Sequence, residues 1–233
     1  MVSENVEEYL ECIWELSQRS SPVKTNDISK KMEVTPASVT EMLQRLAEMG
    51  YVNYERYHGV TLTPEGERIG AKIKRKHRLM ERFLVDIIGL DKVESHKEAC
   101  RLEHTLSDES EKRICQMMNN PKTCPDGDPI PACDQDCRMC ISEPSIPLTD
   151  VGRGEMATIT HLRCEDTGKM RRIIAMGLVP GRNICVEDKL PMGGPIVLNV
   201  EDCKIALAKD YARLVHVLPK GKCNPRKGAE ITS

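Results

Sequence analysis

The sequence predicts a mainly α-helical chain that ends in a small β-rich domain. Apolar residues recur at helical spacing through most of the segment from Val6 to Met118, whereas short β-branched runs alternate with glycine turns from Leu148 to Leu218. Hydrophobic residues make up 39% of the 233 residues and aromatic residues only 3%, so we expect a core of Leu, Ile, Val and Met. Such a core suits helices that pack on helices.

Three short helices are predicted first. One spans residues 6–16, and a second runs from Lys24 to Met32 with Thr25 or Asn26 as its N-cap. The third begins after Thr35, a good N-cap, with a proline at the first helical position, and ends at Gly50.

A hairpin is expected next, because residues 51–63 read YVNYERYHGVTLT, two β-rich runs about a His58-Gly59 turn. The order of helix, helix–turn–helix and hairpin is that of a winged helix–turn–helix, which predicts DNA binding. The candidate base-contacting residues lie in the first turn of the third helix: Thr35, Pro36, Ala37, Ser38 and Thr40. Arg56 and His58 on the wing are candidate phosphate contacts.

Between Glu65 and Arg82 the chain carries seven Lys/Arg residues and three acidic residues, although its formal net charge is only −2. This basic run has two interpretations. It is a solvated helix face, or it contacts DNA phosphates from Lys72 to Lys76.

The segment from Pro121 to Pro147 is rich in proline and cysteine, which predicts an irregular linker. We find no apolar stretch that predicts a membrane span and no secretory leader, so we expect a cytoplasmic protein whose thiols are reduced. The 11 cysteines then indicate metal ligation or redox chemistry more than disulfides.

Candidate metal ligands follow helical spacing in the central segment. His77 and Glu81 are four residues apart, and a second stripe holds His96, Cys100, Glu103 and His104. Glu8 and Glu11 form a further pair near the N-terminus. Imidazole, thiolate and carboxylate together suit a first-row ion such as Fe, Mn, Co, Ni or Zn. The alternative is an exposed, charged helix face.

These residues carry a resemblance. Residues 75–114 (RKHRLMERFLVDIIGLDKVESHKEACRLEHTLSDESEKRI) closely resemble the dimerisation and metal-binding region of the diphtheria toxin repressor family of iron- and manganese-dependent regulators. The helix–turn–helix with VTPASVTEMLQRLAEMGYV, and the loop CPDGDPIP, are similar to the same family. Residues 170–217 resemble the SH3-like domain of ferrous iron transport protein A.

The resemblance implies three domains: a winged helix–turn–helix over residues 1–64, a helical metal-binding and dimerisation domain with a Cys/Pro-rich tail over 65–141, and an SH3-like β-barrel over 147–219. It also implies a metal-dependent repressor of iron or manganese homeostasis that binds operator DNA as a homodimer. We expect no enzymatic activity, no membrane partner and no small-molecule substrate.

The resemblance further implies the ligands. The regulatory metal site would comprise Glu8, Cys100, Glu103 and His104. The ancillary site would comprise His77, Glu81 and His96, completed by Asp166 of the third domain. A binuclear cluster of Glu8, Glu11, His77, Glu103 and His104 is the alternative. One thiolate among oxygen ligands favours Fe(II), with Mn(II) as the second choice.

The extra cysteines leave a different function open. Cys124, Cys133, Cys137 and Cys140 could hold zinc or an iron–sulfur cluster, form a thiol redox pair, or be incidental residues of a linker. The alternative function is therefore a winged-helix regulator that senses thiol redox state or such a cluster. An enzyme that uses the His/Cys/Glu stripe, and an interaction protein built on the third domain, are weaker alternatives.

Overall fold

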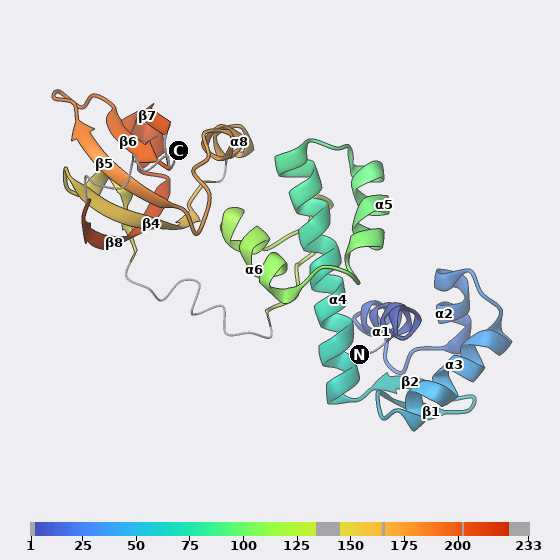
Figure 1. Ribbon diagram of the computed structural model, residues 1–233. Coiled ribbons are helices and arrows are strands. Elements are labelled where there is room, and N and C mark those ends of the chain that lie inside the picture. The colour runs from blue at the N-terminus through green and yellow to red at the C-terminus, as the bar shows by residue number, and fades with distance from the viewer. Residues whose placement is uncertain (1–2, 134–144, 165, 202, 224–233) are drawn as a thin grey trace, which may run out of the picture. The chain divides into compact units, whose positions relative to one another are not determined.

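A computed structural model describes residues 3–133, 145–164, 166–201 and 203–223 (Figure 1). The chain divides into two compact units. The described part of the first comprises residues 3–82, 91–106 and 122–133, and that of the second comprises residues 83–90, 107–121 and the described residues from 145 onward. No helix in these ranges is both long and apolar enough to cross a membrane.

The first unit begins with the elements of a winged helix–turn–helix: α1 (Glu4–Ser17), α2 (Thr25–Met32), α3 (Pro36–Glu48), β1 (Val52–Glu55) and β2 (Gly59–Leu62). As predicted, Thr35 caps α3, because its hydroxyl accepts a hydrogen bond from the Ser38 amide at 3.2 Å. The predicted caps of α2 are wrong: the N-cap is Lys24, which makes no side-chain capping bond.

One hydrophobic core joins these elements. Leu10 and Ile13 of α1 pack with Ile28 of α2 and with Leu43 and Leu46 of α3, and all five are fully buried. The two strands pair antiparallel, and Val23 forms a bridge to Val60 of β2. The turn lies at residues 56–58 rather than at His58-Gly59. The backbone at residue 59 passes close to the backbone at Val23. This explains Gly59, since a Cβ there would lie 2.6 Å from the Val23 carbonyl oxygen.

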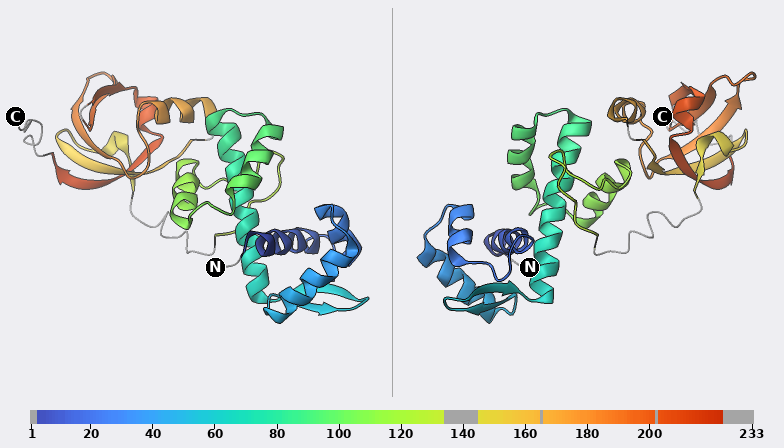
Figure 2. Two further views of the ribbon diagram at one scale, coloured as in Figure 1. Left: turned by 45° about the vertical axis from the view of Figure 1, so that its right-hand side comes forward. Right: turned by 180° about the vertical axis from the view of Figure 1, so that it is seen from behind.

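The long helix α4 (Pro64–Phe83) follows, and α1 packs against it (Figure 2). Gly70 makes this close approach possible, because a Cβ at this position would lie 2.5 Å from the Leu10 carbonyl oxygen and 2.9 Å from the Trp14 Cβ. The contact fixes which face of α1 meets the second half of α4.

Both interpretations of the basic run on α4 are wrong for its central residues. Lys74, Arg75, Lys76 and Arg78 are at most 9% exposed, so they are neither a solvated face nor available to DNA. Arg75 donates to the Pro131 carbonyl and Arg78 to the Pro129 carbonyl, while Lys76 donates to the Leu106 carbonyl. The linker loop and the segment between α5 and α6 supply carbonyl partners to Arg75, Arg78 and Lys76, as buried charges require.

Helix α5 (Lys92–Leu102) completes the helical part of the first unit. Asp91 caps it, and its carboxylate accepts hydrogen bonds from the amides of Val93 and Glu94. The cap fixes where the helix starts and therefore which face carries His96 and Cys100.

The second unit contains the π-helix η1 (Leu84–Ile88), α6 (Asp108–Met117) and a six-stranded antiparallel sheet of order β3-β8-β4-β5-β6-β7. The strands are β3 (Ile146–Pro147), β4 (Glu155–Leu162), β5 (Asn183–Lys189), β6 (Ile196–Val200), β7 (Cys203–Leu207) and β8 (Val215–Lys222). Two short helices, η2 (Leu148–Asp150) and α9 (Lys209–Ala212), lie between strands. The sequence also failed to predict a longer helix, α8 (Thr167–Ala175).

A disulfide joins Cys185 of β5 to Cys223, which follows β8. This corrects the expectation that all thiols are reduced. The strand register explains the pairing. Both β5 and β8 pair with the start of β4, and this brings residues 38 positions apart in sequence to a Cα–Cα distance of 6.0 Å.

We expect Gly70→Ala to lower the free energy of unfolding of the first unit by about 1–3 kcal/mol, because the added methyl group must push α1 away from α4. Urea denaturation followed by circular dichroism measures this change. A variant as stable as the wild type would show that the close approach of the two helices is not required.

Candidate metal centre

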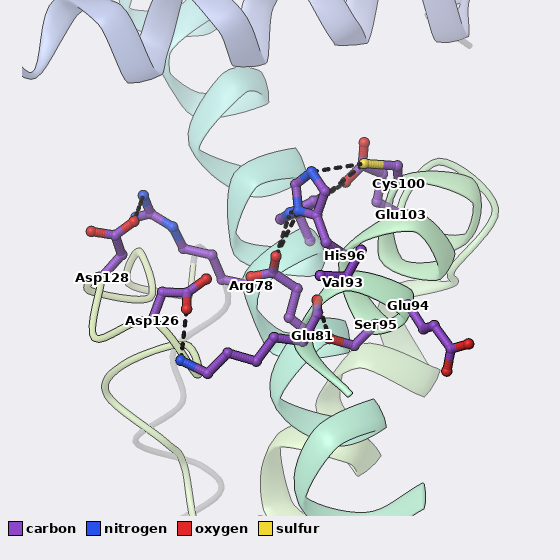
Figure 3. A network of polar contacts seen from close by, with 12 residues as sticks. Arg78, Glu81, Val93, Glu94, Ser95, His96, Cys100, Glu103, Asp126 and Asp128 are labelled. Atoms are coloured by element: carbon purple, nitrogen blue, oxygen red, sulfur yellow. Dashed lines mark hydrogen bonds and ion pairs between the residues drawn. The ribbon is translucent and has the colours of Figure 1, made fainter. Parts of the chain in front are cut away.

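The predicted ligands of the central stripe and of α1 come together in the first unit. Glu8 and Glu11 lie on α1, His77 and Glu81 on α4, and His96 and Cys100 on α5; Glu103 and His104 directly follow α5. Figure 3 shows the α4 and α5 side chains converging between the helices.

His77 is the central residue of this cluster and is 3% exposed. Its Nδ1 lies 2.6 Å from a carboxylate oxygen of Glu103, and its Nε2 lies 3.1 Å from Glu81 and 3.2 Å from Nδ1 of His96. The sulfur of Cys100 lies 3.9 Å from Nδ1 of His77 and 3.9 Å from Nε2 of His96. Each partner can therefore exchange its contact with the imidazole for a contact with a shared cation.

Three groups of side chains have ligand atoms within 4.8 Å of one another: His77 with His96 and Cys100, Glu11 with His77 and Glu103, and Glu4 with Glu8 and His104. Ligand atoms on opposite sides of a first-row ion lie about 4.2–4.6 Å apart, given bonds of roughly 2.1–2.3 Å. Small side-chain rotations therefore bring each group into coordination distance. His77 belongs to two groups, and a Glu103 oxygen lies 3.3 Å from His104 Nε2, so the groups adjoin.

The two sites implied by the resemblance adjoin in the structure. Cys100 of the implied regulatory site lies beside His77 and His96 of the implied ancillary site. Glu103 lies between His77 and His104, and its carboxylate reaches both imidazoles. The arrangement is thus a continuous cluster that spans both implied sites.

His104 provides the best test of whether these residues fit a metal. Its side chain is 5% exposed, and Nε2 makes no hydrogen bond among the described residues, although a carboxylate oxygen of Glu103 lies 3.3 Å from it. Its Nδ1 lies 2.8 Å from a carboxylate oxygen of Glu7. A carboxylate that fixes one ring nitrogen and leaves the other free is the arrangement typical of a metal-binding histidine. The donor set, and an Nε2 that makes no hydrogen bond but lies beside the Glu103 carboxylate, fit a divalent first-row ion.

Sequence reasoning missed Glu4 and Glu7. Glu4 is four residues before Glu8 and shares its face of α1, so helical spacing could have indicated it. Glu7 could not have been found in this way, because it acts through His104, which is 97 residues away.

The ionisable side chains of the cluster shift one another's pKa. Burial disfavours the charged imidazole of His77, but its contacts with Cys100, Glu103 and Glu81 prevail and raise its pKa to about 11. Burial also opposes ionisation of Glu81, yet hydrogen bonds from His77 and His96 lower its pKa to about 2. Burial and repulsion from Glu11 raise the pKa of Glu103, against the attraction of His77.

The remaining predicted ligands belong to other segments of the chain. Asp166 belongs to the second unit, where its carboxylate caps α8 by accepting a hydrogen bond from the Lys169 amide at 3.0 Å. Cys124 is buried and Cys133 half-buried at the end of the described linker. Cys137 and Cys140 lie outside the described residues.

Two of the predicted DNA-contacting residues, Thr40 and Arg56, line one cleft of the winged domain. Thr35, Pro36, Ala37 and Ser38 are exposed at the start of α3, and Thr40 is half-buried. The cleft has a volume of about 340 Å³ and is lined by Lys24, Thr25, Asn26, Thr40, Tyr54, Arg56, Tyr57 and Gly59. Lys24, Thr25 and Asn26, at the amino end of α2, were not predicted from the sequence to lie on the DNA-binding face.

Three family models match the sequence. The N-terminal DNA-binding domain of iron-dependent repressors matches residues 1–60, their metal-binding and dimerisation domain matches residues 63–132, and the FeoA domain matches residues 146–219.

Known relatives match along most of their length. The diphtheria toxin repressor of Corynebacterium diphtheriae is 36% identical over 222 residues, which cover 92% of this chain and 96% of that protein. The iron-dependent repressor IdeR of Mycobacterium leprae is 30% identical over 225 residues, with the same coverage of 92% and 96%.

Solved structures show a related fold. A manganese-dependent transcriptional repressor in complex with manganese aligns with a TM-score of 0.50 at 28% identity, covering 92% of this chain and all of that one. The manganese regulator SloR aligns with a TM-score of 0.51 at 26% identity and covers 94% of this chain. With matched DNA-binding, metal-binding and FeoA segments, and relatives at least 30% identical over almost their whole length, the chain belongs to the iron-dependent repressor family that includes the diphtheria toxin repressor.

Proposed function

We propose that this protein is a transcriptional repressor whose DNA binding is switched on by a divalent transition metal at the cluster around His77 and His104. One observation carries the proposal: carboxylates of α1, the first helix of the DNA-binding domain, lie within ligand distance of His77, Glu103 and His104. These three residues belong to the segment matched by the metal-binding and dimerisation domain.

The chain's own charges explain why a cation would matter. Glu11 and Glu103 repel each other, and the repulsion contributes to the raised pKa of Glu103. A bound divalent ion supplies the positive charge that relieves this repulsion and joins ligands from the two segments. Glu7 keeps His104 oriented for that role, and Gly70 keeps α1 close enough to α4 for Glu11 to reach His77.

The expected effect on DNA binding follows from the core of the winged domain. Leu10 and Ile13 of α1 pack in the same core as Leu43 of α3, so fixing α1 also fixes the base-reading helix. Since a helix–turn–helix dimer reads two half-sites about 34 Å apart, or a multiple of this, the orientation of each reading helix determines affinity. The ion must favour the DNA-competent arrangement for this coupling to work.

For the metal itself we propose Fe(II), with Mn(II) as the alternative. The cluster offers one thiolate, three imidazoles and several carboxylates. Sulfur and nitrogen ligands favour Fe(II) over Mn(II) by softness, whereas Glu4, Glu8 and Glu11 are oxygen ligands that Mn(II) accepts readily.

On the DNA-binding face, we propose that Lys24 and Arg56 bind backbone phosphates on either side of the cleft and that the first turn of α3 contacts base edges. The cleft lies between the amino end of α2, where backbone amides favour anions, and the wing. The N-cap Thr35 and the first three residues of α3 are small, so close approach to bases and thymine methyl groups is sterically open.

We expect His104→Ala to abolish metal-stimulated operator binding while the protein stays a folded dimer, because the variant loses the ligand that Glu7 orients. Glu7→Gln should weaken metal binding about 10–100-fold, the range typical for the loss of a partner that orients a ligand. Anaerobic fluorescence-anisotropy titrations of operator DNA with Fe(II) or Mn(II) measure both effects.

Glu94→Ala, at an exposed position of α5 outside the cluster, is the matched control and should bind as the wild type does. Wild-type metal dependence in His104→Ala would contradict the proposed site.

The pKa shifts predict a second result. His77 titrates near pH 11 in the fold, above its ordinary value of 6.5, so its protonation stabilises the metal-free fold fully below pH 6.5 and this stabilisation is lost as the pH rises toward 11. Glu81 titrates near pH 2, below its ordinary 4.5, so its contribution is full above pH 4.5 and is lost toward pH 2. The His77→Gln substitution should therefore lower the free energy of unfolding of the metal-free protein most strongly between pH 4.5 and 6.5.

Urea denaturation in the presence of a chelator, repeated from about pH 5 to pH 10, measures this cost. The metal affinity of the folded protein should rise with pH across this whole range, because His77 must lose its proton to bind an ion. A cost that stayed constant with pH would show that His77 is not protonated in the metal-free fold.

We expect Arg56→Ala to weaken operator binding and to reduce the slope of log affinity against log salt by about 1, as the loss of one phosphate contact does. Glu94→Ala again serves as the control. An unchanged salt slope would remove Arg56 from the phosphate-binding residues.

A further inference from the structure

Glutamates form a stripe along α1 at helical spacing: Glu4, Glu8, Glu11 and Glu15. Glu4 and Glu8 lie near His104, and Glu11 lies near His77 and Glu103. The last member, Glu15, instead pairs with two lysines, one on α4 and one on α2. The stripe therefore connects the candidate metal centre with the ion pairs that Glu15 forms with these two lysines.

Lys74 is the central residue of these ion pairs. Its side chain is 11% exposed, and its ammonium nitrogen lies 2.6 Å from an oxygen of Glu15 and 3.2 Å from an oxygen of Glu11. Glu15 in turn lies 2.5 Å from the ammonium of Lys31, in the last turn of α2. A buried ammonium requires such partners, because burial without them is strongly unfavourable.

Glu11 therefore has two competing roles. Its carboxylate pairs with Lys74, and it is also a member of the group formed with His77 and Glu103. Its side chain is 13% exposed, so water offers little compensation if either positive partner is lost. An ammonium ion and a divalent cation then compete for one carboxylate.

We propose that Lys74 is an internal competitor for the metal position formed by Glu11, His77 and Glu103, and that it sets the metal concentration at which this position fills. The inference rests on the proposed metal-dependent function. In the metal-free protein Lys74 neutralises Glu11 beside the like charge of Glu103. When Glu11 turns to a metal, Lys74 retains Glu15, so the buried ammonium keeps a counter-ion.

Glu15 is thus a positioning residue for the move of Glu11 from Lys74 to a metal. It holds Lys74 next to Glu11 and gives the ammonium a second partner at the shorter distance. A purely structural ion pair between α1 and α4 would predict lower stability on removal of Lys74 and no gain in metal affinity. Competition predicts that stability falls and metal affinity rises.

The test is an anaerobic calorimetric titration of the full-length metal-free protein with Co(II) alone, with visible absorption as a second readout. The Glu11→Gln variant should lack the binding step at the position formed by Glu11, His77 and Glu103, and so identifies this step in the titration. In this step Lys74→Met should bind Co(II) about tenfold or more tightly than the wild type. Its metal-free form should melt at a lower temperature, and saturation with Co(II) should raise that temperature by more than in the wild type. Lys97→Met, which removes the same charge from an exposed position of α5, should bind as the wild type does.

A double-mutant cycle separates competition for Glu11 from a general change in charge. In the Glu11→Gln background, Lys74→Met should change Co(II) affinity little. Glu15→Gln should weaken Co(II) binding, because Lys74 is then left with Glu11 as its carboxylate partner. If Lys74→Met does not fold, as judged by circular dichroism, Glu15→Gln against an exposed Glu94→Gln control still decides the question.

Equal Co(II) affinity in Lys74→Met and Lys97→Met, or in Glu15→Gln and Glu94→Gln, would overturn this inference and leave the proposed function standing. A Lys74→Met effect of the same size with and without Glu11 would also overturn it. Failure of the wild-type protein to bind Co(II) at all would overturn the inference and the proposed function together.

Discussion

His77 is buried between carboxylates that come from two helical segments, and the rest of the candidate site depends on how this charge is balanced. A buried imidazole in contact with Glu81 and Glu103 is stable while it carries a proton. Replacement of that proton by a divalent ion would keep the carboxylates neutralised and would add ligands from α1. The same group can therefore stabilise the metal-free fold and provide the place where a metal enters.

The packing of α1 connects the charge balance at His77 with the DNA-binding domain. Gly70 lets α1 approach α4 closely, which brings Glu11 to the cluster. The opposite face of α1 contributes Leu10 and Ile13 to the core that holds α3, the proposed base-reading helix. One helix thus carries both the proposed ligands and part of the core of the winged domain, so a change in its position would reach α3 directly.

The sequence predicted the architecture well because helical spacing and N-caps are local signals. Thr35 caps α3 as expected, the fold class and family are confirmed, and most predicted ligands of α1, α4 and α5 lie in one cluster. Other features depend on contacts between distant residues, which spacing cannot show. Examples are the Glu7–His104 pair, the burial of Lys74 and the Cys185–Cys223 disulfide. The ligand roles and domain boundaries implied by the resemblance stay predictions.

The central claim is that one bound ion takes ligands from both α1 and the helices that follow. A crystal structure of the protein loaded with Fe(II) or Mn(II), with the metal located by anomalous scattering, tests it most directly. The account predicts an ion within about 2.0–2.3 Å of a carboxylate oxygen of Glu8 or Glu11 and of a nitrogen of His77 or His104. An ion bound only by residues of α4 and α5, with both α1 carboxylates directed away from it, would contradict the account.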